Sequence, residues 1–169
     1  RGSALVHWND ELNPCTRNIE SPLGPGMLRP LEVTVDMIQV NGDLRPHEWE
    51  LVSDFVRQYP TVWFRVMDYL RPRNLEFLRR FTFVRWFWVD FLKLDNTSGF
   101  AYLPDDLEGL SFGSTRTRKH SLAFLKRFRG LTHLRLESQA KDISVISGLT
   151  SLEKLLLRSI TLPDLSLLQ

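Results

Sequence analysis

Cysteine is almost absent from this chain of 169 residues, and its scarcity excludes several classes of protein. Cys15 is the single cysteine, so neither an intramolecular disulfide nor a cysteine-rich zinc site can form. A single cysteine favours either a reducing compartment or indifference to the redox state, and we predict a cytoplasmic protein. Long apolar stretches are missing too. No run reaches the roughly 18 residues of a membrane span, and the first residues lack the apolar core of a signal peptide.

Sequence motifs of common enzymes are also missing. The chain has no glycine-rich phosphate loop and no H-E-x-x-H, G-x-S-x-G or C-x-x-C pattern. Its four histidines are scattered, and His133 has a nearby carboxylate, Glu137, but no obvious nucleophile. We interpret His133 as an interface residue and predict a protein that is not an enzyme and holds neither a cofactor nor a metal ion.

Neither positive nor negative residues are in large excess, since 22 Lys and Arg stand against 20 Asp and Glu. The formal net charge is +2, with 43% apolar and 25% charged residues, which is ordinary for one soluble domain. No field of the whole chain therefore directs it to nucleic acid. Aromatic residues are abundant instead, with eleven Phe, five Trp and three Tyr.

A repeat organises the second half of the chain. The pattern L-x-x-L-x-L occurs twice, at Leu131/Leu134/Leu136 and at Leu152/Leu155/Leu157. The same spacing recurs upstream with other apolar residues, at Leu107/Leu110/Phe112, Val84/Phe87/Val89 and Thr61/Phe64/Val66. Successive first positions lie 23, 23, 24 and 21 residues apart, and Thr61 is the only one of the fifteen that is not apolar.

This period resembles that of leucine-rich-repeat proteins, in their irregular bacterial form. The resemblance covers residues 61–169 and is clearest over 131–169. It implies an α/β fold, a curved solenoid with parallel strands on its concave face and short helices on its convex face. One feature of the family is missing. Its Asn or Cys after each strand, which caps the turn, is replaced by Tyr69, Leu92, Thr115, Gln139 and Ile160, so the turns must be satisfied in another way.

Three segments are predicted along the chain. Residues 1–30 form an irregular leader, in which Trp8, Leu12, Ile19 and Leu23 are available to cover an exposed edge of the core. Residues 31–60 form a capping unit, with an alternating strand over 31–40 and a helix over 45–58. Residues 61–169 hold about five repeats, and the apolar residues at 165–168 predict that repeats continue beyond the chain end.

Shorter elements are expected between the strands. Helical spacing predicts convex helices over 73–80 and 119–129 and a shorter helical turn within 142–149. The same linker pattern returns at 162–168. The polar residues 95–99 predict a loop.

Side chains alternate along a strand, so the repeat register also predicts which residues point away from the core. Three ladders follow, one for each outward position of the strands. They are Trp63, Trp86, Gly109, His133 and Lys154; then Arg65, Trp88, Ser111, Arg135 and Leu156; then Met67, Asp90, Gly113, Glu137 and Arg158.

We interpret this outward surface as a binding site for a partner protein, because Trp and Arg dominate the energetics of protein interfaces. The early coils carry an aromatic and cationic patch of Trp63, Arg65, Trp86 and Trp88. The later coils carry a charged zone of His133, Arg135, Glu137, Lys154 and Arg158. Asp90 of an earlier coil belongs to the same zone. Two alternatives stay open: the early register is shifted by one, or the leader covers the rings. Either would make the tryptophans part of the core.

A basic segment over 116–129 raises a second hypothesis, binding to nucleic acid. Its cations are Arg116, Arg118, Lys119, His120, Lys126, Arg127 and Arg129. The simpler interpretation is the solvated face of a convex helix. A third hypothesis makes the chain the repeat part of a larger enzyme or effector. The first remains preferred. The short coils resemble stand-alone bacterial repeat proteins, and among their roles the lack of a visible export signal favours an immunity, inhibitor or regulatory protein over an adhesin.

Overall fold

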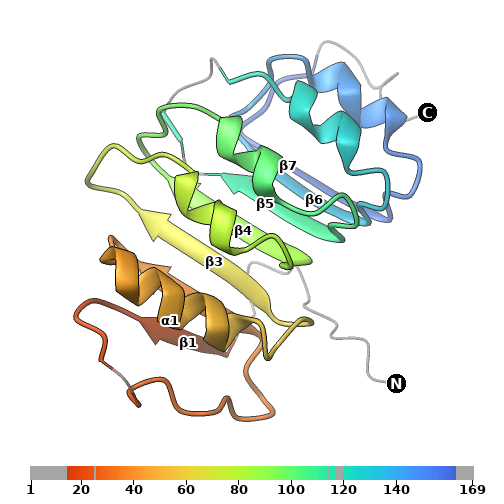
Figure 1. Ribbon diagram of the computed structural model, residues 1–169. Helices are drawn as coiled ribbons and strands as arrows, with labels where there is room; N and C mark the ends of the chain where they lie inside the picture. The colour runs from red at the N-terminus through yellow and green to blue at the C-terminus, as the bar shows by residue number, and fades with distance from the viewer. Residues whose placement is uncertain (1–14, 25, 114, 117–119, 163–169) are drawn as a thin grey trace.

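The computed structural model describes residues 15–24, 26–113, 115–116 and 120–162. They contain one parallel sheet whose seven strands follow the order of the chain (Figure 1). The strands are β1 (Thr16–Ile19), β2 (Met37–Asn41), β3 (Trp63–Asp68), β4 (Trp86–Phe91), β5 (Gly109–Gly113), β6 (His133–Glu137) and β7 (Lys154–Arg158).

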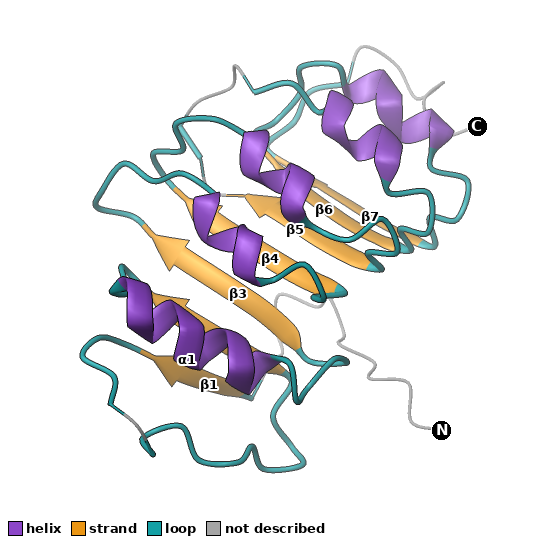
Figure 2. Ribbon diagram, viewed as in Figure 1, coloured by secondary structure: helices purple, strands orange, loops and turns teal. Residues whose placement is uncertain are grey.

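The described helices all lie on the same face of this sheet (Figure 2). They are the α-helix α1 (Pro46–Val56) and the short 3₁₀ helices η1 (Glu76–Arg80), η2 (Ser98–Tyr102), η3 (Ala123–Arg127) and η4 (Ile143–Gly148). Neighbouring strands are spaced about 4.8 Å apart, whereas packed helices need about 8–10 Å. The helical side of each coil is therefore the wider one, and the strands line the concave face.

The predicted triplets are in register across the sheet. Phe64 pairs with Phe87, Phe87 with Leu110, Leu110 with Leu134 and Leu134 with Leu155. The first four of these side chains are fully buried against the helices, and only Leu155 at the last strand is partly exposed. Each coil thus adds one strand and one apolar layer to a continuous core. The chain has a leucine-rich-repeat fold.

Aromatic rings fill the core where leucine is scarce. Phe64 stacks on Phe81 with ring centroids 4.5 Å apart, and Phe100 stacks on Phe124 at 4.3 Å. Trp49 of α1 stacks on Phe77 of η1 at 4.6 Å, which joins the capping helix to the first repeat. Burying a Phe side chain contributes about 1.5–3 kcal/mol, so these rings replace the leucines of a regular repeat.

The N-terminal region differs from the sequence expectation in two places. Residues 16–19 form β1, which pairs in parallel with β2, although residues 1–30 were expected to be irregular. The strand expected over 31–40 begins only at Met37. In β1 only Ile19 is buried among its four residues, so the edge strand carries no apolar pattern that the sequence could reveal.

The polar residues expected to form a loop at 95–99 instead lead into η2. The carboxamide of Asn96 accepts a hydrogen bond from the backbone N–H of Ser98 at 3.1 Å, and Phe100 is fully buried. Burial of that ring fixes the turn as a 3₁₀ helix. The helices expected over 45–58, 73–80 and 119–129 are present in shortened form, as α1, η1 and η3.

A carboxylate supplies the missing turn cap after β3. Asp68 Oδ1 accepts hydrogen bonds from the backbone N–H groups of Leu70 at 2.8 Å and Arg71 at 3.1 Å. Its other oxygen binds Arg73, whose Nη2 lies 2.6 Å away. Burial raises the pKa of Asp68, but these backbone donors and the Arg73 guanidinium together lower it below its usual value. A buried Asp one residue before the family's capping position thus replaces Asn.

Glu48 fixes the segment that follows β1. The carboxylate is fully buried and accepts hydrogen bonds from the backbone N–H of Leu23 at 2.7 Å and of Arg45 at 2.7 Å, and from the hydroxyl of Ser21. Leu23 and Ile19 are buried in the core, as expected of the leader. Trp8, Leu12, Arg118, Lys119 and the apolar residues at 165–168 lie outside the described residues.

Candidate functional site

The concave face carries the side chains that the register places outward. Arg65 pairs with Trp88, Trp88 with Ser111, Ser111 with Arg135 and Arg135 with Leu156, as the second ladder predicts. The first and third ladders are confirmed by the same pairings, with Trp86 beside Gly109 and Asp90 beside Gly113. The alternative of a register shifted by one is therefore excluded.

Pointing outward does not guarantee exposure. Trp63, Asp90 and Arg135 are only 2%, 1% and 6% exposed, so the expectation of a solvent-exposed surface is wrong for these three. Trp86 and Trp88 pack edge-on against Trp63, with ring centroids 5.2 and 6.3 Å away. The remaining predicted residues are accessible. Arg65, Trp86, Trp88, His133 and Glu137 are half-buried, and Lys154 and Arg158 are exposed.

Trp88 lies between two guanidinium groups. Arg65 Cζ is 4.4 Å from the centroid of its ring, and Arg135 Cζ is 4.6 Å from it. The three residues stand at the same level on β3, β4 and β6, so β5 must leave space between Trp88 and Arg135. It does so with the small Ser111. Cation–π contacts of this kind stabilise by about 0.5–2 kcal/mol each and fix the indole in one orientation.

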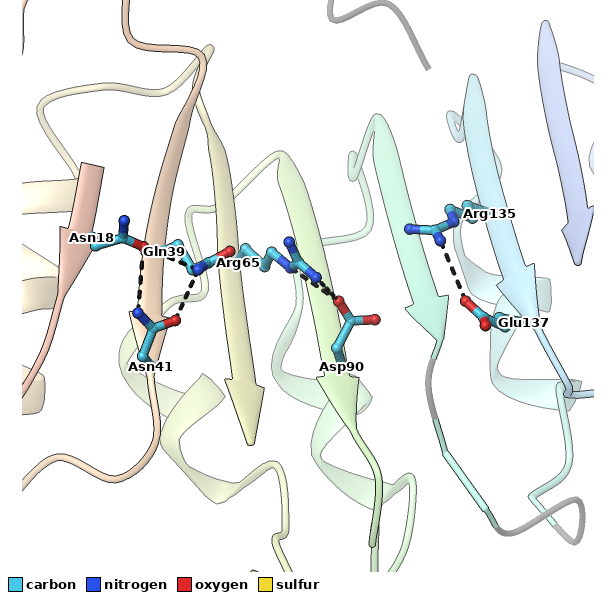
Figure 3. Close-up of polar contacts among 7 residues, drawn as sticks. All are labelled: Asn18, Gln39, Asn41, Arg65, Asp90, Arg135 and Glu137. Carbon is cyan, nitrogen blue, oxygen red and sulfur yellow. Dashed lines mark hydrogen bonds and ion pairs between the residues drawn. The ribbon is translucent and has the colours of Figure 1, made fainter. Parts of the chain in front are cut away.

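Each guanidinium of this stack is also bound to a carboxylate (Figure 3). Arg65 Nε donates to Asp90 Oδ2 at 2.9 Å, and its Nη2 makes a second bond to the same oxygen. Arg135 Nη2 donates to Glu137 Oε2 at 3.3 Å. The centre of the concave face is therefore a neutral cluster of two ion pairs around one tryptophan, which we call the Trp88 cluster.

A second group of rings crosses the starts of the strands. Trp86 makes edge contacts with Trp63 and with His133, each at a centroid distance of 5.2 Å. Gly109 lies beneath the Trp86 ring, and a methyl group there would overlap it and would lie 2.8 Å from Trp63. Burial, and then the nearby Lys154 ammonium, lower the pKa of His133 below 6.5, so this imidazole is neutral at pH 7.

Sequence reasoning missed a polar network on the first two strands (Figure 3). Gln39 Nε2 donates to the side-chain oxygens of Asn18 at 3.0 Å and Asn41 at 2.8 Å. Asn41 Nδ2 in turn donates to Asn18 and to Glu20. These amides continue the outward ladders onto β1 and β2. The sequence offered no signal for them because β1 itself was not predicted.

A cavity between α1 and η1 lies outside the concave face. Its volume is about 420 Å³, and its lining includes Trp49, Phe77 and Arg73. Arg73 is bound within the chain, with its Nη1 2.9 Å from Asp43 and its Nη2 2.6 Å from Asp68. The cavity thus has an aromatic wall and a guanidinium that already has two carboxylate partners.

The basic segment lies around η3, on the convex side. Arg116, Lys126 and Arg129 are exposed there. Arg127 is engaged within the chain, since its Nε and Nη2 donate to Asp105 at 2.9 and 2.7 Å and its Nη1 to the carbonyl of Ala101 at 2.6 Å. His120 contacts the carbonyl oxygen of Leu94 at 3.0 Å.

Within the part of the chain that the structure describes, no group of three or more His, Cys, Asp or Glu side chains is arranged to hold a metal ion. None of its helices is long and apolar enough to cross a membrane.

Similarity to known proteins was found among solved structures. No protein-family model matches the chain, and no curated protein matches it. Among solved structures, it is similar to an internalin (inlF) from Listeria monocytogenes at 15% sequence identity and a TM-score of 0.37. The match covers 80% of this chain and 51% of the internalin, so the chain spans about half the length of that protein. The leucine-rich-repeat fold described above follows from the strand register of the chain itself.

Proposed function

We propose that this protein is a non-catalytic scaffold that binds a partner protein on its concave face. The observation that carries the proposal is the Trp88 cluster, in which one indole is held between two guanidinium groups that are each bound to a carboxylate. Trp and Arg supply much of the binding energy at protein interfaces when they lie centrally and lose water on binding.

Preorganisation strengthens this argument. Ordering a flexible side chain at an interface costs about 0.5–1.5 kcal/mol. Arg65 and Trp88 already hold each other in place and remain partly accessible, so a partner would meet a surface whose ordering cost is small. The cluster is also neutral, which favours a protein surface of mixed polarity over a polyanion.

Nucleic-acid binding by the basic segment has less support. Arg127 is bound to Asp105 and to the backbone, which leaves fewer cations for phosphate contacts. The half-buried Trp86 and Trp88 belong to the outward ladders of the sheet. The helices lie on its other face, so stacking and phosphate contacts cannot combine at one site.

Within the protein-binding class we propose an inhibitor or immunity role, in which the concave face covers a functional surface of its partner. A preorganised face suits such a role, because the most tightly bound inhibitors change their shape little on binding. If the repeats belong to a longer effector or enzyme, the same face would serve as its partner-binding part.

The experiment begins with the unmodified chain as bait in lysate of its source cells, followed by purification of the partner it retains. The affinity of that partner is then measured for Trp88→Ala and for the convex control Arg129→Ala. Truncating a central Trp is expected to weaken binding at least about 30-fold, corresponding to about 2 kcal/mol, while the control binds like the parent chain.

Circular dichroism and urea unfolding of the same variants complete the test. If Trp88→Ala stays folded and binds the partner unchanged, the concave face is not the interface. If the variant unfolds, Arg65→Gln provides the second test, since it removes one cation of the stack at a half-buried position.

A further inference from the structure

Arg65 and Arg135 on the concave face each have a carboxylate partner, whereas the cations of its last described strand do not. Asp90 neutralises Arg65, and Glu137 neutralises Arg135. On β1 and β2 the outward side chains are mainly amides that bond to one another. Two cations of β7 remain, Lys154 and Arg158, and within the described parts of the chain neither has a carboxylate partner.

Lys154 and Arg158 have a defined direction and spacing on β7. Both are exposed and point to the concave side, four residues apart on one strand. At about 3.3 Å per residue, their Cα atoms are separated by about 13 Å. Leu156, half-buried, points outward between them. The strand therefore presents a cation, an apolar side chain and a second cation in a line.

The neighbouring strand limits what can approach this line. His133 stands beside Lys154, and its lowered pKa keeps it neutral, so it adds no third charge. Glu137 stands beside Arg158, and Glu153 precedes Lys154. Two separate carboxylates four residues apart match the spacing of the two cations and add less negative charge beside Glu137 and Glu153 than a continuous row of phosphates would.

We propose that β7 binds an extended acidic segment of a partner protein, with the pattern acid–x–apolar–x–acid. The two carboxylates pair with Lys154 and Arg158, and the apolar side chain between them packs on Leu156. An extended segment has the same rise per residue as β7, so its alternate side chains match this spacing. The inference rests on the proposed function and specifies the chemistry of the partner.

The test uses the full chain and three synthetic probes. The first is the acetylated and amidated peptide Gly-Glu-Gly-Leu-Gly-Glu-Gly, the second has Gln in place of both Glu residues, and the third is a decamer of thymidylate. Binding is followed by titration of ¹⁵N-labelled protein, which reports both affinity and the strands that contact the probe.

We expect the Glu peptide to shift the backbone signals of β6 and β7 and the Gln peptide to bind at least about tenfold more weakly. The double variant Lys154→Gln/Arg158→Gln should lose about tenfold in affinity for the Glu peptide, because two exposed ion pairs are removed. The control Lys126→Gln/Arg129→Gln removes the same charge from exposed convex positions and should bind like the parent chain.

Equal binding of the Glu and Gln peptides, or an unchanged affinity of the Lys154→Gln/Arg158→Gln variant, overturns the inference. So does thymidylate binding at β7 with a higher affinity than the peptide, which would assign the two cations to phosphate. These outcomes are distinct from failure of the proposed function. A partner whose binding depends on Trp88 but not on Lys154 and Arg158 refutes only the acidic segment.

Discussion

At the scale of single residues, Gly109 determines how the aromatic rings of the concave face pack. The ring of Trp86 lies where a β-carbon of residue 109 would be, and Trp63 lies close by. Only glycine lets β5 pass beneath the rings, so the contact between Trp86 and His133 across β5 depends on it.

Gly109→Ala is therefore expected to displace Trp86 and to lower the free energy of unfolding by about 1–3 kcal/mol, the usual cost of overpacking. The matched control is Gly130→Ala, because nothing lies within 4 Å of a β-carbon at Gly130. Urea unfolding followed by tryptophan fluorescence measures both effects. Equal stability of the two variants would show that Trp86 does not need this space.

The Glu48 carboxylate is expected to make the stability of the folded state depend on pH in the acid range. Hydrogen bonds from the backbone N–H groups of Arg45 and Leu23 lower the pKa of this carboxyl below 4.5. A lowered pKa means that the ionised form stabilises the folded state. This stabilisation is complete above about pH 4.5, the unfolded value, and is lost as the pH falls through the folded pKa.

Glu48→Gln should accordingly be less stable than the parent chain at pH 7, and its stability should fall less between pH 5 and pH 3. Glu50→Gln on the same helix is the control, since the Glu50 side chain is 67% exposed and lies 3.7 Å from Arg80. Urea unfolding at a series of pH values measures both. Parallel acid profiles for Glu48→Gln and the parent would contradict the role of Glu48.

At the scale of elements, the turn after β3 shows how a repeat holds its shape without the family's Asn. Asp68 caps two backbone N–H groups and binds Arg73, which also reaches Asp43 of the preceding coil. One carboxylate thus joins the ends of two coils.

Asp68→Ala should lower the free energy of unfolding by about 1–2 kcal/mol, because it removes the cap of two backbone N–H groups and a carboxylate partner of Arg73. Asp106→Ala is the comparison, as the Asp106 side chain is 72% exposed and 3.9 Å from its nearest cation. It should change stability by less than about 0.5 kcal/mol. Denaturation midpoints decide the matter, and an Asp68→Ala variant as stable as Asp106→Ala would refute the capping role.

The sequence predicts strands best where the buried apolar residues recur at a nearly fixed interval along the chain. Strands β3 to β7 and their register follow from apolar triplets 21–24 residues apart, because each triplet must face the same core. Strand β1 could not be found in this way, since only Ile19 reaches the core from that edge. The turn at η2 was missed because its one core residue, Phe100, follows a polar stretch.

The sequence predicted the direction in which the side chains of the candidate site point, but not how exposed those side chains are. Alternation along the strands placed Trp63, Asp90 and Arg135 outward, yet all three are buried. Trp63 packs edge-on against Trp86, and Arg135 stacks on Trp88. Such contacts depend on side-chain conformations that a repeat pattern does not determine.

At the scale of the whole molecule, the two faces of the solenoid differ in chemistry. The helical face closes the apolar core, and the concave face carries ordered aromatic and charged side chains that the core does not require. A solenoid of this kind offers a long surface whose residues are set one coil at a time. We propose that its central neutral cluster and its cationic last described strand form two zones of contact with one partner.

The most direct measurement is site-specific photo-crosslinking with benzoylphenylalanine in place of single residues of the full chain. Met67 and Leu156 are half-buried concave positions on β3 and β7, and Glu76 and Lys126 are exposed convex positions on η1 and η3. If the concave face is the binding surface, the two concave positions crosslink to the same partner protein and the convex positions do not. Crosslinks from Glu76 or Lys126, with none from Met67 or Leu156, would contradict it.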